Sequence, residues 1–209
     1  MFDSRQTIES WKGKSQNFIY KHRKNQIKFE LGMAHRQQRK RIFRICRNRL
    51  VTMSIDNQTI EIIDFTNELC DPIKSLNYEW LEKYFRVEEG DVVSLSNPKK
   101  YIIDKGGFIF YAKLDNKIVG TVSLLKRADT IYELGKMAVT DSAKGLGIGT
   151  ILLEQCLYEA KQKQIKTLIL YSNTILQSAM HLYRKYGFEE VELESDLYER
   201  ANIKMEKHL

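Results

Sequence analysis

Three glycines at alternate positions lie between a run that is predicted to be a strand and a run that is predicted to be a helix. They belong to the segment Lys144-Gly145-Leu146-Gly147-Ile148-Gly149. A backbone without Cβ atoms lets a ligand approach closely, and the first N–H groups of a helix have no partners within that helix. With the positive end of the helix dipole, these amides form a site for phosphate or pyrophosphate. A tight turn would explain the same glycines, so the flanking residues have to decide.

The length and composition of the chain fit one domain with a small appendage. Its 209 residues suffice for a sizeable core, and its hydrophobic content of 43% is ordinary. The three cysteines, Cys46, Cys70 and Cys156, are odd in number, widely spaced and without a histidine cluster, so they indicate neither a disulfide framework nor a metal site. No apolar run approaches the roughly 18 residues of a membrane span. We therefore expect a cytoplasmic protein.

The positive charge is concentrated in the first quarter of the chain. Residues 1–52 hold 14 Lys and Arg against 3 Asp and Glu, a net charge of +11, whereas residues 53–209 hold 20 against 24, a net charge of −4. Segments of such density are usually solvated, so residues 1–52 are predicted to be a basic extension, disordered or partly helical. Three explanations stay open: an arm that contacts nucleic acid or an anionic surface, a cleaved targeting segment, or residues upstream of a start at Met53.

From Met53 onward the hydrophobic periodicity alternates between that of strands and that of helices. The predicted strands are 59–64, 108–114, 117–125, 131–139, 167–171, 188–193 and 203–206. The predicted helices are 72–84, an irregular piece at 92–95, 148–163 and 175–186. Asp115-Asn116 predicts a hairpin turn, and Gly187 predicts the end of a helix. The order predicts an α/β (α+β) domain over residues 53–209, with a mixed, mostly antiparallel central sheet flanked by helices.

Two short motifs occur in this domain, in order. Lys144, Gly147 and Gly149 match a loop pattern of Arg or Gln, two residues, Gly, one residue, and Gly or Ala, with Lys in the first place. Residues 179–188, AMHLYRKYGF, match a second pattern in which an Ala and a Tyr precede Gly-Phe. With this spacing the chain resembles the GCN5-related N-acetyltransferase (GNAT) superfamily over about residues 55–207.

The resemblance implies an enzyme that transfers the acetyl group of acetyl-CoA directly to a primary amine. The implied coenzyme-binding residues are Met137, Ala138, Val139, Lys144, Gly145, Leu146, Gly147, Ile148, Gly149, Thr150 and Asn173. The loop amides would bind the pyrophosphate, and one amide of residues 137–139 would stabilise the oxyanion. Lys144 supplies charge without the planar fork of an arginine. Asn173 lies six residues before Ala179, so capping of the next helix is an equal reading.

Two catalytic residues are implied as well. A phenol with a pKa of about 10 can donate a proton to a departing thiolate whose thiol has a pKa of about 8.5, and Tyr183 is the candidate. The acceptor amine has a pKa of about 10.4 if it is lysine-like, so a base is required. Glu133 is that candidate; by strand alternation it is expected on the same face as Met137, although a merely solvated glutamate explains the pattern equally well.

Several questions remain open at this level. The acceptor is a small-molecule or peptide amine, in a pocket that the resemblance places at about residues 80–86 and 190–200. The alternative functions are a nucleic-acid or ribosome-associated protein that acts through its basic arm, and a non-catalytic CoA-binding sensor. The protein is expected to be a monomer or a homodimer.

Overall fold

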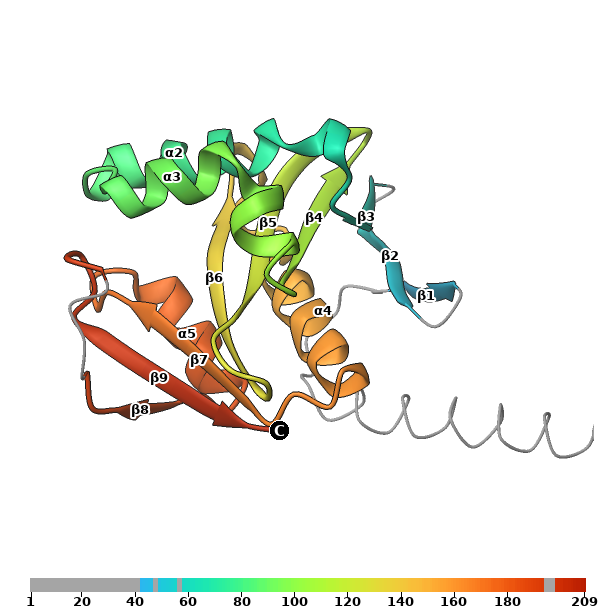
Figure 1. The fold of residues 1–209 in the computed structure, drawn as a ribbon. Coiled ribbons are helices and arrows are strands. Elements are labelled where there is room, and N and C mark those ends of the chain that lie inside the picture. Colours follow the sequence, from blue (N-terminus) through green and yellow to red (C-terminus); the bar gives the residue numbers. More distant parts are fainter. Residues whose placement is uncertain (1–41, 47–48, 56–57, 194–197) are drawn as a thin grey trace, which may run out of the picture. The chain divides into compact units, whose positions relative to one another are not determined.

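A nine-stranded sheet runs through the described part of the chain (Figure 1). The computed structural model describes residues 42–46, 49–55, 58–193 and 198–209, with side chains from residue 59 onward. The strand order is β1-β2-β3-β4-β5-β6-β7-β9-β8, antiparallel throughout except for the parallel pair β6 and β7. The strands are β1 (Ile42–Cys46), β2 (Arg49–Ile55), β3 (Gln58–Asp64), β4 (Phe108–Leu114), β5 (Lys117–Lys126), β6 (Ile131–Val139), β7 (Thr167–Ser172), β8 (Glu189–Val191) and β9 (Ile203–His208).

Four α-helices flank this sheet in the described residues. They are α2 (Asp71–Tyr84), α3 (Glu89–Ser96), α4 (Ile148–Gln162) and α5 (Gln177–Lys185), and a π-helical turn, Lys99–Ile103, follows α3. The predicted mixed, mostly antiparallel sheet with flanking helices is confirmed. The hairpin at Asp115-Asn116 is also found: both residues have positive φ, 45° and 68°, as a two-residue β-turn of the hairpin type requires.

The first two strands were not predicted. Residues 42–46 and 49–52 were assigned to the basic extension, but they form β1 and part of β2, which pair onward to β3. Every residue of Ile42–Cys46 except Arg44 is apolar, and Ile42 and Ile45 are β-branched, which suits a strand; the charge density of the surrounding segment hid this pattern. The chain divides between Lys40 and Arg41. Residues 1–41, and with them the predictions about a disordered or nucleic-acid-binding arm, lie outside the described residues.

Alternate residues of the central strands feed two hydrophobic clusters, one on each face of the sheet. Phe110 and Ala112 of β4 join a larger cluster with α4 and α5, whereas Ile109 and Tyr111 join a smaller one with α2 and α3. Each cluster is therefore built from one side of the pleat, and the helices must cover both faces.

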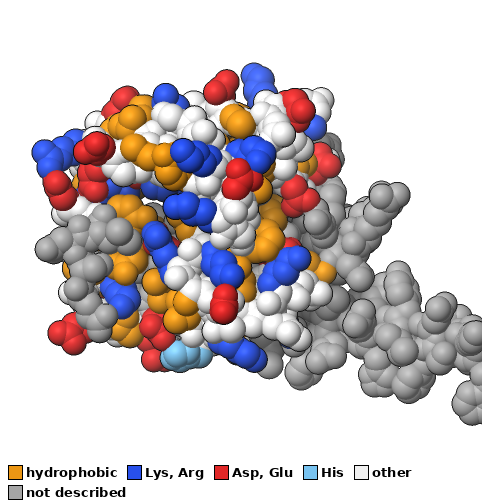
Figure 2. Space-filling model, in the orientation of Figure 1, with side chains coloured by type: hydrophobic (Ala, Val, Ile, Leu, Met, Phe, Trp, Pro, Cys, Tyr) orange, Lys and Arg blue, Asp and Glu red, His pale blue; other side chains and the backbone are white. Residues whose placement is uncertain are grey.

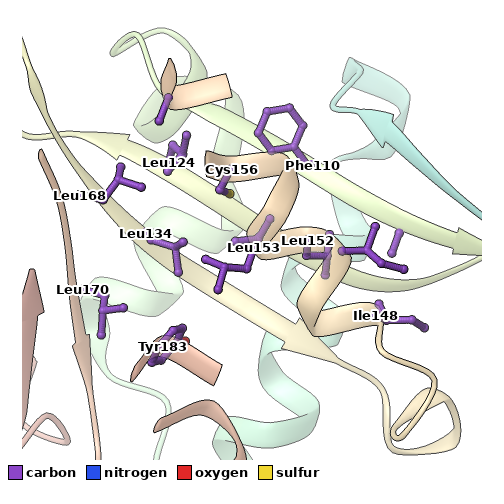
Figure 3. Packing of buried hydrophobic residues seen from close by; sticks show 14 of the residues in the cluster. Phe110, Leu124, Leu134, Ile148, Leu152, Leu153, Cys156, Leu168, Leu170 and Tyr183 are labelled. Carbon is purple, nitrogen blue, oxygen red and sulfur yellow. The ribbon is translucent and has the colours of Figure 1, made fainter. Parts of the chain in front are cut away.

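Helix α4 supplies the centre of the larger cluster. Leu152, Leu153 and Cys156 are fully buried, and Figure 3 shows them directed among strand residues that include Leu124 and Leu134. Burial of a leucine side chain contributes about 1.5–3 kcal/mol, so these contacts fix α4 against the sheet. The position of the helix N-terminus is thereby fixed too.

Helix α5 ends as the sequence predicted. Gly187 has φ of +78°, its N–H donates to the carbonyl of Arg184 at 3.0 Å, and the N–H of Phe188 donates to the carbonyl of Tyr183 at 3.1 Å. This is a Schellman motif, whose left-handed residue favours glycine. The ring of Phe188 then meets the ring of Tyr183 edge to face, with 5.9 Å between centroids. The Gly-Phe pair thus helps to hold Tyr183 in place.

The described surface carries charges of both signs. Lys and Arg side chains lie among Asp and Glu side chains on the face shown in Figure 2. Within the described residues, no helix is both long and apolar enough to span a bilayer.

Two glycines give a matched test of the packing before β4. An added Cβ at Gly107 would lie 2.5 Å from the carbonyl oxygen of Leu124 and 2.8 Å from that of Ile102, whereas at Gly90 it would meet nothing within 4 Å. We expect Gly107→Ala to lower the free energy of unfolding by about 1–3 kcal/mol and Gly90→Ala to leave it unchanged or slightly raised. Chemical denaturation measures both. Equal stability of the two variants would contradict this packing.

Candidate active site

The site begins where two neighbouring strands separate. The parallel pairing of β6 with β7 covers three residue pairs and ends at Glu133 and Ile169, although β6 continues to Val139 and β7 to Ser172. Beyond these pairs, the backbone of β6 on the β7 side has no strand partner among the described residues. Unpaired backbone groups of this kind need another partner, which a ligand can supply.

A β-bulge lies in the same stretch of β6. Two residues, Lys136 and Met137, stand opposite Val122 of β5, and Lys136 has φ of +50°, in the left-handed region. The bulge shifts the alternation by one residue. Before the bulge, Glu133 pairs with Leu125, which belongs to the smaller cluster, whereas Met137, in the bulge, packs on the larger one. The expectation that Glu133 and Met137 share a face is wrong for this reason.

A cavity of about 750 Å³ opens at this point. Its walls come from α2, the second half of β6, the glycine loop with the start of α4, the end of β7, α5 and the segment 198–201. Of the predicted site residues, those that line it are Glu133, Met137, Ala138, Val139, Lys144, Gly145, Gly147, Ile148, Gly149, Thr150, Asn173 and Tyr183. Leu146 is not in this lining and packs against the larger hydrophobic cluster instead.

The glycine loop has the backbone that its sequence suggested. Gly145 and Gly147 have φ of +81° and +78°, and Gly147 is the N-cap of α4. At Gly149 an added Cβ would lie 3.5 Å from Cε of Met137 and 3.7 Å from Cδ2 of Leu182, so α4, β6 and α5 come close there. The first turn of α4 holds no acidic residue. Its unpartnered amides thus face the cavity without a competing carboxylate.

Lys144 and Lys83 share the carboxylate of Asp141. Lys83 Nζ lies 2.5 Å from Oδ2, and Lys144 forms an ion pair with Oδ1. Hydrogen bonds from Lys144 and Lys83, in that order, lower the pKa of Asp141 to about 2. Lys144 also lies over the ring of Tyr84, with its Nζ 5.9 Å from the centroid. The lysine of the loop motif is therefore held at the edge of the cavity.

Tyr183 is directed from α5 toward β6. Its side chain is buried, and its hydroxyl donates to Sδ of Met137 at 3.7 Å. Burial, followed by the charge of Cys156, raises the pKa of Tyr183 to about 12. The phenol therefore keeps its proton throughout the neutral range and is available as a donor.

Glu133 is buried, and both of its carboxylate oxygens accept hydrogen bonds. Arg127 donates to its Oε2 through Nε at 2.8 Å and also through Nη2, and Tyr198 donates to Oε1 at 2.9 Å. Burial and the charge of Glu133 raise the pKa of Tyr198. Among the described residues that line the cavity, Glu133 is the one carboxylate.

The side chain of Asn173 is engaged within the protein. Its Nδ2 donates to the carbonyl oxygen of Arg200 at 2.7 Å, and its Oδ1 accepts from the N–H of Ile175 at 3.0 Å. It thus closes a turn after β7 rather than serving as the N-cap of α5, which is Leu176. Because Asn173 lines the cavity, a contact between this residue and the coenzyme stays a prediction.

Several residues that line the cavity lie outside the two sequence motifs. Trp80, Tyr84 and Tyr198 fall in the two ranges that were expected to form the acceptor pocket, and Arg200 closes the second of them. Lys136 was not among the predicted site residues, because a single lysine within an apolar strand gives no sign of a bulge. The role of Lys136 depends on partners that are distant in sequence.

Solved structures with this fold include many acetyltransferases. A GNAT-family acetyltransferase from Staphylococcus aureus Mu50 matches 71% of this chain and 98% of its own length, with a TM-score of 0.64 and 22% identity. The PaiA N-acetyltransferase from Thermoplasma acidophilum, solved in complex with coenzyme A, matches 72% and 99%, with a TM-score of 0.57 and 19% identity. At these identities the likeness shows the fold.

Sequence comparison identifies the family. The probable N-acetyltransferase camello of Xenopus tropicalis is 29% identical over 98 residues, 46% of this chain and 45% of the relative. Streptothricin acetyltransferase A of Bacillus subtilis is 28% identical over 105 residues, 50% and 58%. The chain thus spans about half the length of the curated relatives it matches. Residues 74–188, more than half of the chain, match the acetyltransferase (GNAT) family, and the chain belongs to this family.

The ion pairs of Asp141 give a test of the loop geometry. We expect this carboxyl to titrate at about 2, and Lys144→Met, more than Lys83→Met, to move its pKa toward the ordinary 3.8. Because the folded-state pKa is depressed, its stabilising contribution is present above about pH 4 and is lost as the pH falls through 2. Carboxyl carbon NMR measures the titration, with Lys161→Met at the far end of α4 as the control. A wild-type pKa near 3.8 would contradict the ion pairs.

Proposed function

We propose that this protein is an N-acetyltransferase that transfers the acetyl group of acetyl-CoA directly to a primary amine. One observation carries the proposal: the start of α4, the half of β6 that does not pair with β7, and Tyr183 line a single cavity. These parts supply an anion site, a strand edge and a proton donor, which are what transfer from a thioester requires.

The loop side of the cavity fits the diphosphate of the coenzyme. Several amides converge at the start of α4, where the first turn has no carboxylate and two glycines take left-handed conformations. Lys144 and Lys185 add positive charge to the lining. A neighbour with the same fold was solved with coenzyme A, which supports use of an acyl-CoA here.

The strand side fits the acyl arm. At the edge of β6 from which β7 has separated, alternate residues of 137–139 present backbone groups that have no strand partner among the described residues. In the proposed reaction one N–H of this edge stabilises the oxyanion that forms when the amine attacks the thioester carbonyl. Preorganised donors of this type typically contribute about 3–4 kcal/mol to transition-state stabilisation.

Proton transfers complete the proposed reaction. The amine nitrogen forms a bond to the carbonyl carbon and gives its proton to Glu133, and the carbon–sulfur bond then breaks. Tyr183 donates its proton to the departing thiolate, which is released as the thiol. The contact of Tyr183 with Met137 supports this assignment, because it directs the hydroxyl to the strand that holds the acyl group.

Binding of acetyl-CoA is the first test. We expect micromolar binding with a thermal shift, and release of free thiol when an acceptor amine is added. Gly149→Leu should weaken binding about tenfold or more, because a branched side chain would enter the crevice next to Met137. The matched control is Gly90→Leu, also at the second residue of a helix but in open space. Absence of saturable binding to the wild type would refute the proposed function.

Tyr183→Phe tests the proton donor. We expect kcat to fall about 100-fold, since general acids typically contribute that factor or more, while the Kd for acetyl-CoA changes less than about threefold. Steady-state kinetics and calorimetry provide the two numbers. Tyr186→Phe, at the C-cap of the same helix and outside the cavity lining, serves as the control. Unchanged kcat in Tyr183→Phe would remove this role.

A further inference from the structure

Four charged residues form a buried cluster beside the cavity, which we call the acceptor-side cluster: Glu88, Asp91, Lys136 and Arg200. Lys136 Nζ lies 2.7 Å from Oδ1 of Asp91, and Arg200 Nη1 lies 2.7 Å from Oδ2 of Asp91 and 2.9 Å from Oε1 of Glu88. The side chain of Asp91 is 1% exposed and that of Lys136 is 6% exposed. The cluster joins α3, β6 and the segment before β9.

The two signs of charge have different positions relative to the cavity. Lys136 and Arg200 line it, whereas Asp91 and Glu88 are not in the described lining. The two carboxylates therefore lie behind the two cations as seen from the cavity. The described contacts use one of the three ammonium donors of Lys136 and two of the guanidinium nitrogens of Arg200, which leaves donors for a further anion.

An aromatic ring frames the two cations. Lys136 Nζ lies 5.5 Å and Arg200 Cζ 5.0 Å from the centroid of Tyr198, and Arg200 also lies 5.9 Å from the centroid of Trp80. The hydroxyl of the same tyrosine donates to Glu133. Tyr198 thus links the cations to the one carboxylate of the described lining, and Arg127 already neutralises that carboxylate.

The cluster limits the acceptor through hydrogen bonds rather than through net charge. Asp91 and Glu88 balance the charges of Lys136 and Arg200, and Arg127 balances that of Glu133. The two cations that line the cavity still have N–H donors without a partner in the cluster. An acceptor with an anionic group beside its amine can accept hydrogen bonds from these donors.

We propose that the acceptor is a small amine with a carboxylate next to the amino group, an amino acid or a conjugate of one, and that Arg200 and Lys136 bind this carboxylate. The inference rests on the proposed function. Lys136 directly precedes Met137 on β6, about 3.8 Å away between Cα atoms. Lys136, Arg200 and the strand edge of β6 line one cavity, so an acceptor whose carboxylate is bound by the two cations would carry its amine in the cavity that holds the acyl group. Because Nη1 and Nη2 of Arg200 bind Asp91, the donors left for this carboxylate are Nε–H and the second N–H of Nη2.

Matched acceptors test the inference on the full chain. Thiol release from acetyl-CoA is measured with phenylalanine, leucine and glutamate, with the corresponding amides, with phenethylamine and isoamylamine, and with spermidine. We expect kcat/KM for each amino acid to exceed that of its amide and its decarboxylated amine by at least tenfold. Equal or better use of the amides, the simple amines or spermidine would overturn the inference and leave the proposed function intact. Failure of every amine, with acetyl-CoA bound, would overturn both.

Variants then assign the carboxylate site. We expect Arg200→Gln to lower kcat/KM for the amino acids at least tenfold and to bring the ratio of amino acid to amide close to one, with the Kd for acetyl-CoA unchanged. Arg200→Lys should restore part of the preference because it restores the charge. The control is Arg184→Gln, an exposed arginine of α5 outside the lining. A preference that persists in Arg200→Gln would overturn the assignment. If that variant does not fold, Arg200→Lys and the wild-type acceptor ratios still decide.

Discussion

The short pairing between β6 and β7 is the constraint on which the site depends. Three residue pairs hold the strands together, and beyond them the backbone of β6 has no strand partner among the described residues. The bulge at Lys136 is part of the same constraint. A left-handed conformation at a non-glycine residue costs about 1–3 kcal/mol and persists only where neighbouring residues enforce it. Here Asn77 donates to the carbonyl of Lys136 at 3.3 Å, and Asp91 binds its ammonium.

The opposite wall of the cavity depends on hydrophobic packing. Helix α4 is held by buried side chains on one side, so its first turn keeps a fixed place even though the glycines before it are conformationally permissive. Helix α5 is fixed in the same cluster, and the Schellman motif at its end orders Tyr183 against Phe188. An anion site and a proton donor are thus placed by a common core rather than by loops.

The acceptor-side cluster adds a polar counterpart to this core. Loss of one partner from a buried ion pair typically costs about 3–5 kcal/mol, so Asp91 with Lys136 and Arg200 ties the bulge of β6 to α3 and to the segment before β9. The same contacts orient two cations toward the cavity. One set of interactions therefore serves both the backbone geometry of β6 and the electrostatics that we assign to acceptor binding.

Local patterns determined much of this protein. Periodicity predicted the strands and helices from residue 59 onward, and the two glycine motifs predicted the loop and the end of α5, because each depends on neighbours within a few residues. All the predicted site residues except Leu146 line the cavity. Tertiary structure alone decided the two additional strands, the bulge that moves Met137 to the other face from Glu133, and the pairing of Asp91 with Arg200, 109 residues away. Strand register and buried ion pairs arise from contacts between distant segments, and no local pattern encodes them.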